Sequence, residues 1–109
     1  MPPRRVERLP TFRIGEDAVV HEARTLRSRL LGLAFLRELP TGHALLISDC
    51  RSVHTFGMRF AIDVAFVDER GRALRVERNV QPRRFRGCRR AFAVLEARAG
   101  EIDRFVSVG

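Results

Sequence analysis

The sequence contains no lysine, no tryptophan and no tyrosine, and it has only two cysteines among 109 residues. All 21 basic residues are therefore arginines, a uniformity that indicates a coding bias more than a selected chemistry. The formal net charge of +8 is nevertheless real and will attract polyanions at low salt. We therefore expect an anionic ligand or an acidic protein partner, and we regard a nucleic acid as possible but not favoured.

Long apolar runs are also absent, and none approaches the roughly 20 residues that a membrane span needs. The charged stretch at the N-terminus is not followed by an apolar segment, so we expect no export signal, no membrane partner and a cytoplasmic location. The chain has room for one domain. We predict a flexible arm at 1–9, a single globular domain at 10–109, and a monomer or weak dimer.

The two cysteines, Cys50 and Cys88, form no C-x-x-C motif. Two ordinary thiols are the simplest interpretation, and a disulfide or exchange-active pair is the alternative. If the chain is extended between Cys50 and His54, these residues lie about 13 Å apart, too far to share one zinc ion. We predict no metal and no cofactor.

Hydrophobic periodicity predicts a strand-rich domain. One helix is expected at Leu26–Leu36, where leucines recur at helical spacing, and Pro82–Gly87 is expected as a basic loop. Asp68–Gly71 is expected as a tight turn that joins two strands. Strands are predicted at Thr11–Ile14, Ala18–Glu22, Ala44–Ser48, Ile62–Val67, Ala73–Val80 and Ala91–Ala97. The predicted class is α+β: a compact, mostly antiparallel sheet curled toward a small barrel, with one main helix packed on it.

The densest run of chemically capable side chains lies between Cys50 and Asp63. A hairpin that turns between Met58 and Arg59 would place His54 opposite Asp63, where Cβ atoms lie about 4.5–5.5 Å apart. Strand alternation would put Cys50 and Ser52 on the same polar face. Asp63 interrupts an apolar strand, so it needs a partner, and the candidates are His54, Arg59, Arg51 or backbone N–H groups.

Three interpretations of this polar face stay open. His54 and Asp63 can simply satisfy each other and fix the turn. In a small hydrolase or thiol-dependent enzyme, Asp63 would orient His54 as an acid or base beside Cys50, Ser52 or Cys88. In a non-enzymatic binding or accessory module, which is our leading functional hypothesis, His54, Thr55 and Arg59 would hold an anion, and Met58 and Asp63 would belong to the same ligand-binding site. Phe56 and Met58 beside Gly57 are expected as core residues, with a recognition lip as the alternative.

A second candidate site is the basic segment of Arg83, Arg84, Phe85, Arg86, Arg89 and Arg90. Guanidinium groups with an interleaved aromatic ring can bind phosphates and stack on a base. The segment lacks the motifs of the known nucleic-acid-binding modules, and a solvated loop or a site for acidic partners is the simpler interpretation.

Several motifs follow one another in a specific order. They are Arg29–Leu33, Leu39-Pro40-x-Gly42, Cys50–Phe60, Ile62–Gly71, Ala93–Glu96 and Ala99-Gly100. In these motifs the chain resembles the domain of unknown function 192 family over about two thirds of its length. The resemblance implies a small β-rich fold with a helix on one side, and recurrent positions at His54, Thr55, Met58, Asp63 and Glu96. It implies no catalytic role for any of them, so the function stays unassigned.

Overall fold

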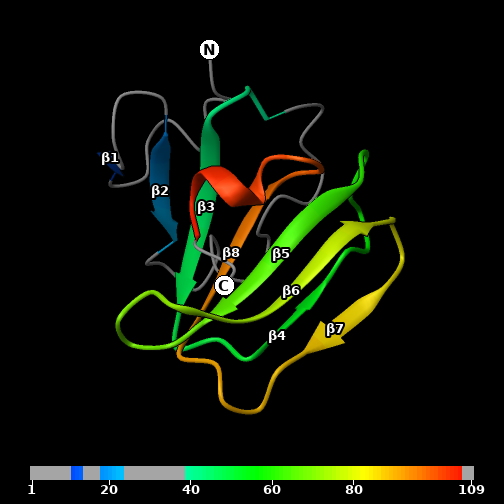
Figure 1. The fold of residues 1–109 in the computed structure, drawn as a ribbon. Coiled ribbons are helices and arrows are strands. Elements are labelled where there is room, and N and C mark those ends of the chain that lie inside the picture. Colours follow the sequence, from blue (N-terminus) through cyan, green and yellow to red (C-terminus); the bar gives the residue numbers. More distant parts are fainter. Residues whose placement is uncertain (1–10, 14–17, 24–38, 107–109) are drawn as a thin grey trace.

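The structure is a computed structural model that describes residues 11–13, 18–23 and 39–106. Within these ranges the chain forms short strands and one 3-10 turn, η1 (Figure 1). The elements are β1 Thr11–Arg13, β2 Val19–Ala23, β3 His43–Ser48, β4 Ser52–His54, β5 Ile62–Val67, β6 Ala73–Val80, β7 Phe85–Gly87, β8 Ala93–Arg98 and η1 Ile102–Arg104.

Six strands form one sheet in the order β1-β2-β3-β8-β5-β6, and β4 pairs with β7 in a separate two-stranded ribbon. The β2–β3 pairing is parallel and the other pairings of both sheets are antiparallel. An ion pair between Arg86 on β7 and Glu77 on β6, with 3.2 Å between Nε and Oε1, joins the ribbon to the edge of the larger sheet.

Hydrophobic clusters lie on both faces of the larger sheet, and every residue of β5 in this sheet is buried. One face of β5 contributes Ile62, Val64 and Phe66 to the first core cluster, as the alternation predicted. The opposite face carries Ala65 and Val67, which belong to a second cluster that includes residues of η1 and the chain after it. Strand alternation places Asp63 on this second face, so its carboxylate lies in the core. The sequence had predicted that this face would be an accessible polar surface.

The predicted turn between β5 and β6 is confirmed. Asp68 donates its N–H to the Arg72 carbonyl at 2.9 Å, and the N–H of Gly71 reaches the Asp68 carbonyl at 3.0 Å. Gly71 has φ +81, the left-handed region in which glycine has no Cβ penalty. The Asp68 carboxylate also accepts from the N–H groups of Arg70 and Arg72, and the Arg72 bond is the largest cause that lowers the pKa of Asp68.

The predicted α+β class with one main helix is wrong. The regular secondary structure of the described residues is nearly all β-strand, and their helical content is the single short turn η1. The sheet is not a closed barrel either, because β1 and β6 are its two edges. The helix expected at Leu26–Leu36 and the arm expected at 1–9 lie outside the described residues. The basic loop expected at Pro82–Gly87 contains the short strand β7.

Candidate functional site

The predicted pairing of His54 with Asp63 does not form. His54 on β4 lies opposite Phe85 on β7, whereas Asp63 on β5 lies opposite Ala97 on β8. The hairpin prediction failed because β5 already has a neighbour on each side, β6 and β8, and therefore has no free edge for β4. His54 is exposed and Asp63 is 1% exposed, so the two side chains do not share a surface.

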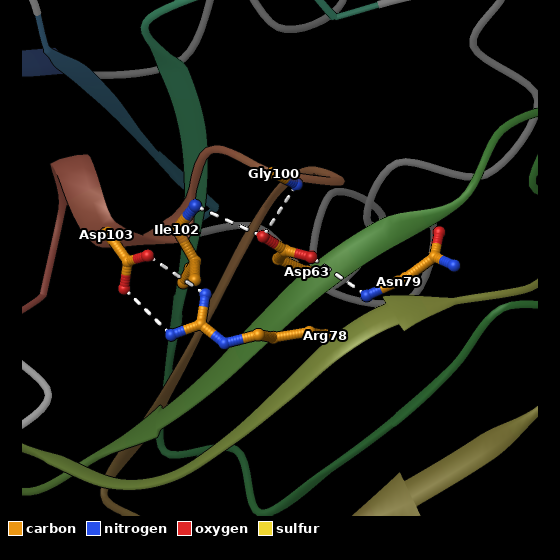
Figure 2. A network of polar contacts seen from close by, with 6 residues as sticks. All are labelled: Asp63, Arg78, Asn79, Gly100, Ile102 and Asp103. Atoms are coloured by element: carbon orange, nitrogen blue, oxygen red, sulfur yellow. Dashed lines mark hydrogen bonds and ion pairs between the residues drawn. The ribbon is translucent and has the colours of Figure 1, made fainter.

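Asp63 is instead bound by backbone N–H groups (Figure 2). Its Oδ1 accepts from the N–H of Asn79 at 2.9 Å, and its Oδ2 accepts from Gly100 at 2.9 Å and Ile102 at 3.3 Å. Backbone N–H groups were among the partners that the sequence left open. Since a buried carboxylate is stable only when it is paired or hydrogen-bonded, these three donors explain how Asp63 can lie in the core.

The Asp63 carboxylate connects two irregular pieces of backbone. Asn79 has φ 52 and lies at a register shift of β6 where extra residues oppose Asp63, which is the pattern of a β-bulge. On the other side, Gly100 and Ile102 begin the segment that forms η1. Asp63 is therefore a structural residue that fastens a bulge of β6 and the turn after β8 to β5.

A second contact in Figure 2 ties the same two segments together at the surface. Arg78 donates to both carboxylate oxygens of Asp103, at 3.0 and 2.9 Å. This fork-to-carboxylate pairing lowers the pKa of Asp103 and raises the pKa of Arg78, through the hydrogen bonds first and the charges second. Both groups are solvent-exposed, so the pair orients η1 more than it stabilises the fold.

Thr55 is also a structural residue, although the sequence placed it among the ligand-binding candidates. It is 1% exposed, and its hydroxyl donates to the Gln81 carbonyl at 2.7 Å and accepts from the N–H of Arg84 at 2.7 Å. Its backbone N–H and carbonyl bind Arg84 and Arg83 as well. Arg83 has φ 66, unusual for a residue with a side chain, and these bonds hold it in place.

The remaining candidates of the central run are dispersed. Met58 is 7% exposed and packs in the first core cluster, whereas Arg59 is exposed. His54 contacts the ring of Phe56, with 6.1 Å between the ring centroids. In the described part of the chain, no hydrogen bond joins His54 to Cys50, Ser52 or Asp63, so the arrangement expected of an acid–base pair with a nucleophile is not assembled.

The two cysteines are free and partly buried. The thiol of Cys50 donates to the Ser52 carbonyl at 3.0 Å. Cys88 packs against the first core cluster and lines the hollow described in the next paragraph. Glu96, the further position implied by the family resemblance, is buried on β8 and lies opposite Leu45 and Val64 on the flanking strands.

An open hollow of about 500 Å³ lies where the ribbon meets the larger sheet. Four arginines, with Gly87 and Cys88, form its lining: Arg51, Arg75, Arg89 and Arg90. The ribbon register places the start of β4 beside the end of β7, and the N–H of Cys88 donates to the Arg51 carbonyl at 2.9 Å. The folded chain thus brings three separate segments of the sequence to one basic site.

Most of the positive charge in this hollow has no acid beside it. Arg75 has Glu77 at 3.5 Å, from its Nε to Oε2, and Glu77 is shared with Arg86. Arg51, Arg89 and Arg90 make no ion pair with an acidic residue in the ranges that the structure describes, and no acid lines the hollow. We call this surface the arginine-lined hollow.

A second open hollow adjoins it through Arg90, which lines both. Its lining includes Phe92, which is 39% exposed, and the turn residues after β5: Asp68, Glu69, Arg70 and Arg72. The acids give this neighbour a mixed charge. Of these two hollows, the one between the ribbon and the sheet has arginines and no acid in its lining.

The basic segment predicted at 83–90 is divided by the fold. Arg89 and Arg90 line the hollow, Arg86 turns to Glu77, and Arg83 and Arg84 are exposed at the opposite end of β7. Sequence reasoning missed Arg51 and Arg75 as members of the site. No local pattern in the sequence indicated that Arg51 or Arg75 would join Arg89 and Arg90.

No helix among the described residues is long and apolar enough to cross a membrane. Within the same residues, no three His, Cys, Asp or Glu side chains gather closely enough to hold a metal ion.

Comparison with known proteins places the chain in a family but assigns it no activity. No curated protein matches it. A protein of unknown function from Novosphingobium aromaticivorans is similar with a TM-score of 0.69 and 23% identity, over 81% of this chain and 69% of that one. A structure from Sinorhizobium meliloti, described as "a putative transcription regulator", is similar with a TM-score of 0.73 and 25% identity, over 86% of this chain and 79% of that one. A family model described as "Uncharacterized ACR" matches residues 11–109, so the predicted resemblance is confirmed and the chain belongs to the domain of unknown function 192 family.

Proposed function

We propose that the protein is a non-enzymatic binding module that takes up an anionic ligand in the arginine-lined hollow. The observation that carries this proposal is the composition of the lining, in which four arginines converge with no acid among them. The sequence predicted a module of this kind but placed its site around His54 and Asp63. The buried position of Asp63 and the arginine lining support the new location.

The chemistry of the hollow fits a phosphate or carboxylate group. A guanidinium is planar and carries a fork of donors that matches the oxygens of either group, and each such charge-assisted bond is stronger than a neutral one. Arginines that face one another without an acid also repel, and an anion between them removes that repulsion. The net charge of +8 raises the rate at which anions arrive at the surface.

The alternative of a hydrolase or thiol-dependent enzyme finds no support in the geometry. Such a mechanism needs a base within hydrogen-bond reach of its nucleophile and a third group that orients the base. The exposed ring of His54 contacts Phe56, and Asp63 uses its carboxylate for the backbone of Asn79, Gly100 and Ile102.

The proposal is tested by calorimetric titration of the protein with inorganic tripolyphosphate at about 50 mM salt, where exposed charges are only partly screened. The test variant is Arg90→Gln and the matched control is Arg98→Gln. Arg98 is exposed at the far end of β8, about 17 Å along the strand from Ala93, and its replacement lowers the net charge equally.

We expect Arg90→Gln to weaken tripolyphosphate binding about tenfold or more, since one hydrogen bond to a charged group contributes about 1.5–3 kcal/mol. Arg98→Gln should change the affinity much less, by the general loss of one charge. Equal weakening by the two variants, or no binding by the unaltered protein, would contradict the proposal.

A further inference from the structure

The ribbon formed by β4 and β7 presents a flat, ring-bearing outer face. Val53 points inward and is buried, whereas Ser52 and His54 on alternate positions are exposed. His54 lies directly opposite Phe85, and opposed residues of an antiparallel pair project from the same face. The ring of Phe56 lies 6.1 Å from the His54 ring, and Phe85 is the strand partner of His54, so His54, Phe56 and Phe85 belong to one part of the ribbon. We call them the ring face.

The phenyl groups of the ring face are unusually exposed. Phe85 is 65% exposed and Phe56 is 55% exposed, more than any other large apolar side chain in the described ranges. A large apolar side chain normally gains stability by burial, so two exposed phenyl rings on one short ribbon indicate a surface that a partner covers. The described residues offer no side chain that covers them.

The backbone beside the ring face is held by hydrogen bonds. Thr55 follows His54 and fastens the residues before Phe85 through its hydroxyl, which donates to Gln81 and accepts from Arg84 at 2.7 Å each. On the other strand, a Cβ added to Gly87 would lie 3.9 Å from the Phe85 ring, an ordinary van der Waals distance, so this ring lies close to the backbone of the ribbon. A backbone that is already ordered loses little conformational entropy when a partner stacks on its rings.

Arginines lie at both ends of the ring face. Arg83 and Arg84 precede Phe85, and the arginine-lined hollow begins at Gly87 and Cys88. From Arg84 to Cys88 an extended chain covers roughly 13 Å, which corresponds to about four stacked nucleotides at ~3.4 Å each. Positive charge thus lies before and after Phe85 along the ribbon, over a length comparable with a few nucleotides.

We propose that the anionic ligand of this protein is a single-stranded nucleic acid, whose bases stack on the ring face while its phosphates contact Arg84 and the arginine-lined hollow. This inference rests on the proposed function and names its ligand class. Stacking on aromatic rings between basic groups is the mode by which single strands are bound without sequence preference. The carboxylates of an acidic peptide would not cover Phe56 and Phe85, and a duplex keeps its bases inside its own stack.

The test uses fluorescence anisotropy with a labelled oligothymidine of about eight nucleotides. Linear polyphosphate of similar charge serves as a competitor that has no bases. The test variant is Phe85→Ala, and Phe85→Trp is the rescue variant because it restores a ring. The matched control is Leu74→Ala, since Leu74 is a large apolar side chain that is 44% exposed on β6, away from the ribbon. Both truncated side chains lie at the surface, so the fold should persist, which circular dichroism checks.

We expect Phe85→Ala to weaken oligothymidine binding about 5- to 150-fold, which corresponds to the roughly 1–3 kcal/mol that one stacked base contributes. Phe85→Trp should restore it, and Leu74→Ala should leave it unchanged. Binding should also fall steeply between about 50 and about 200 mM salt.

The outcomes separate the two proposals. If polyphosphate binding depends on Arg90 but Phe85→Ala leaves oligothymidine binding unchanged, the single-strand inference is wrong and the anion-binding function stands. If oligothymidine binds no more tightly than polyphosphate, the inference is likewise wrong. If neither polymer binds, both proposals are wrong.

Discussion

Replacement of Asp63 is the sharpest test of the structural account. In Asp63→Asn one carboxylate oxygen becomes an amide nitrogen, which donates rather than accepts. The oxygen that remains can serve either Asn79 or the pair of Gly100 and Ile102, so one or two buried N–H groups lose their acceptor and face another donor. Each unsatisfied buried group costs about 1–3 kcal/mol. We expect Asp63→Asn to lower the free energy of unfolding by about 2–4 kcal/mol.

The measurement is urea unfolding followed by far-ultraviolet circular dichroism, because the protein has neither tryptophan nor tyrosine for intrinsic fluorescence. A loss of this size lowers the urea midpoint by roughly 1–3 M for a small domain. Asp63→Ala removes both acceptor oxygens and would cost much of the free energy of unfolding, which is roughly 5–15 kcal/mol for a domain of this size. The asparagine variant is therefore the informative one.

Asp68→Asn is the matched control. Asp68 also accepts two backbone N–H groups, from Arg70 and Arg72 at 2.9 Å each, but both bind one oxygen, Oδ1, in an exposed turn, so the amide oxygen of asparagine can keep both bonds. Its urea midpoint should fall much less than that of Asp63→Asn. Equal midpoints for the two variants would refute the claim that burial makes the Asp63 contacts strong.

A double-mutant cycle distinguishes this account from the rejected His54–Asp63 pair. The structure predicts that the effects of His54→Ala and Asp63→Asn add, because the two side chains share no contact. An interaction energy above about 1 kcal/mol would show that they do meet.

Two further predictions concern Thr55 and His43. Thr55→Val keeps the shape but removes the hydroxyl that bonds Gln81 and Arg84, and it should lower the free energy of unfolding by about 1–3 kcal/mol in the same urea assay. The pKa of His43 is lowered from 6.5, by burial first and by the charge of Arg13 among the lesser causes, so the unfolded chain binds a proton more readily than the folded one. The free energy of unfolding should therefore fall as the pH drops through 6.5 toward the lower pKa of the folded state. In a plot of urea midpoint against pH, His43→Gln should flatten this region. An unchanged slope would show that His43 does not cause the loss of stability.

Local patterns in the sequence predicted much of the sheet. The β5–β6 hairpin was readable because Asp68 and Gly71 specify a tight turn between two apolar strands. Burial of Ile62, Val64 and Phe66 was readable from alternation alone. These features depend on residues that are close in the chain.

Features that depend on distant segments were not readable. The lone acid at Asp63 was rightly expected to need a partner, but its donors come from 16 to 39 residues further along the chain. The hairpin with β4 was preferred because it is local, and it failed because β8 occupies that side of β5. The sequence did not predict the second core face either, because the residues that cover it, in η1 and after it, are far from β5 along the chain.

The candidate site also combines local features that the sequence predicted with long-range features that it did not. The cluster of arginines at 83–90 was evident in the sequence, but the fold turns Arg86 toward Glu77 and sends Arg89 and Arg90 to a hollow shared with Arg51 and Arg75. Which charges converge depends on the ribbon and sheet register, which no local pattern encodes.

The most direct test of the anion-binding account is nuclear magnetic resonance of the arginine Nε–H groups during titration with tripolyphosphate. We predict saturable shifts for Arg51, Arg89 and Arg90, with Arg78 unchanged because its guanidinium already binds Asp103. Shifts spread evenly over all arginines, or confined to residues outside the hollow, would contradict the account.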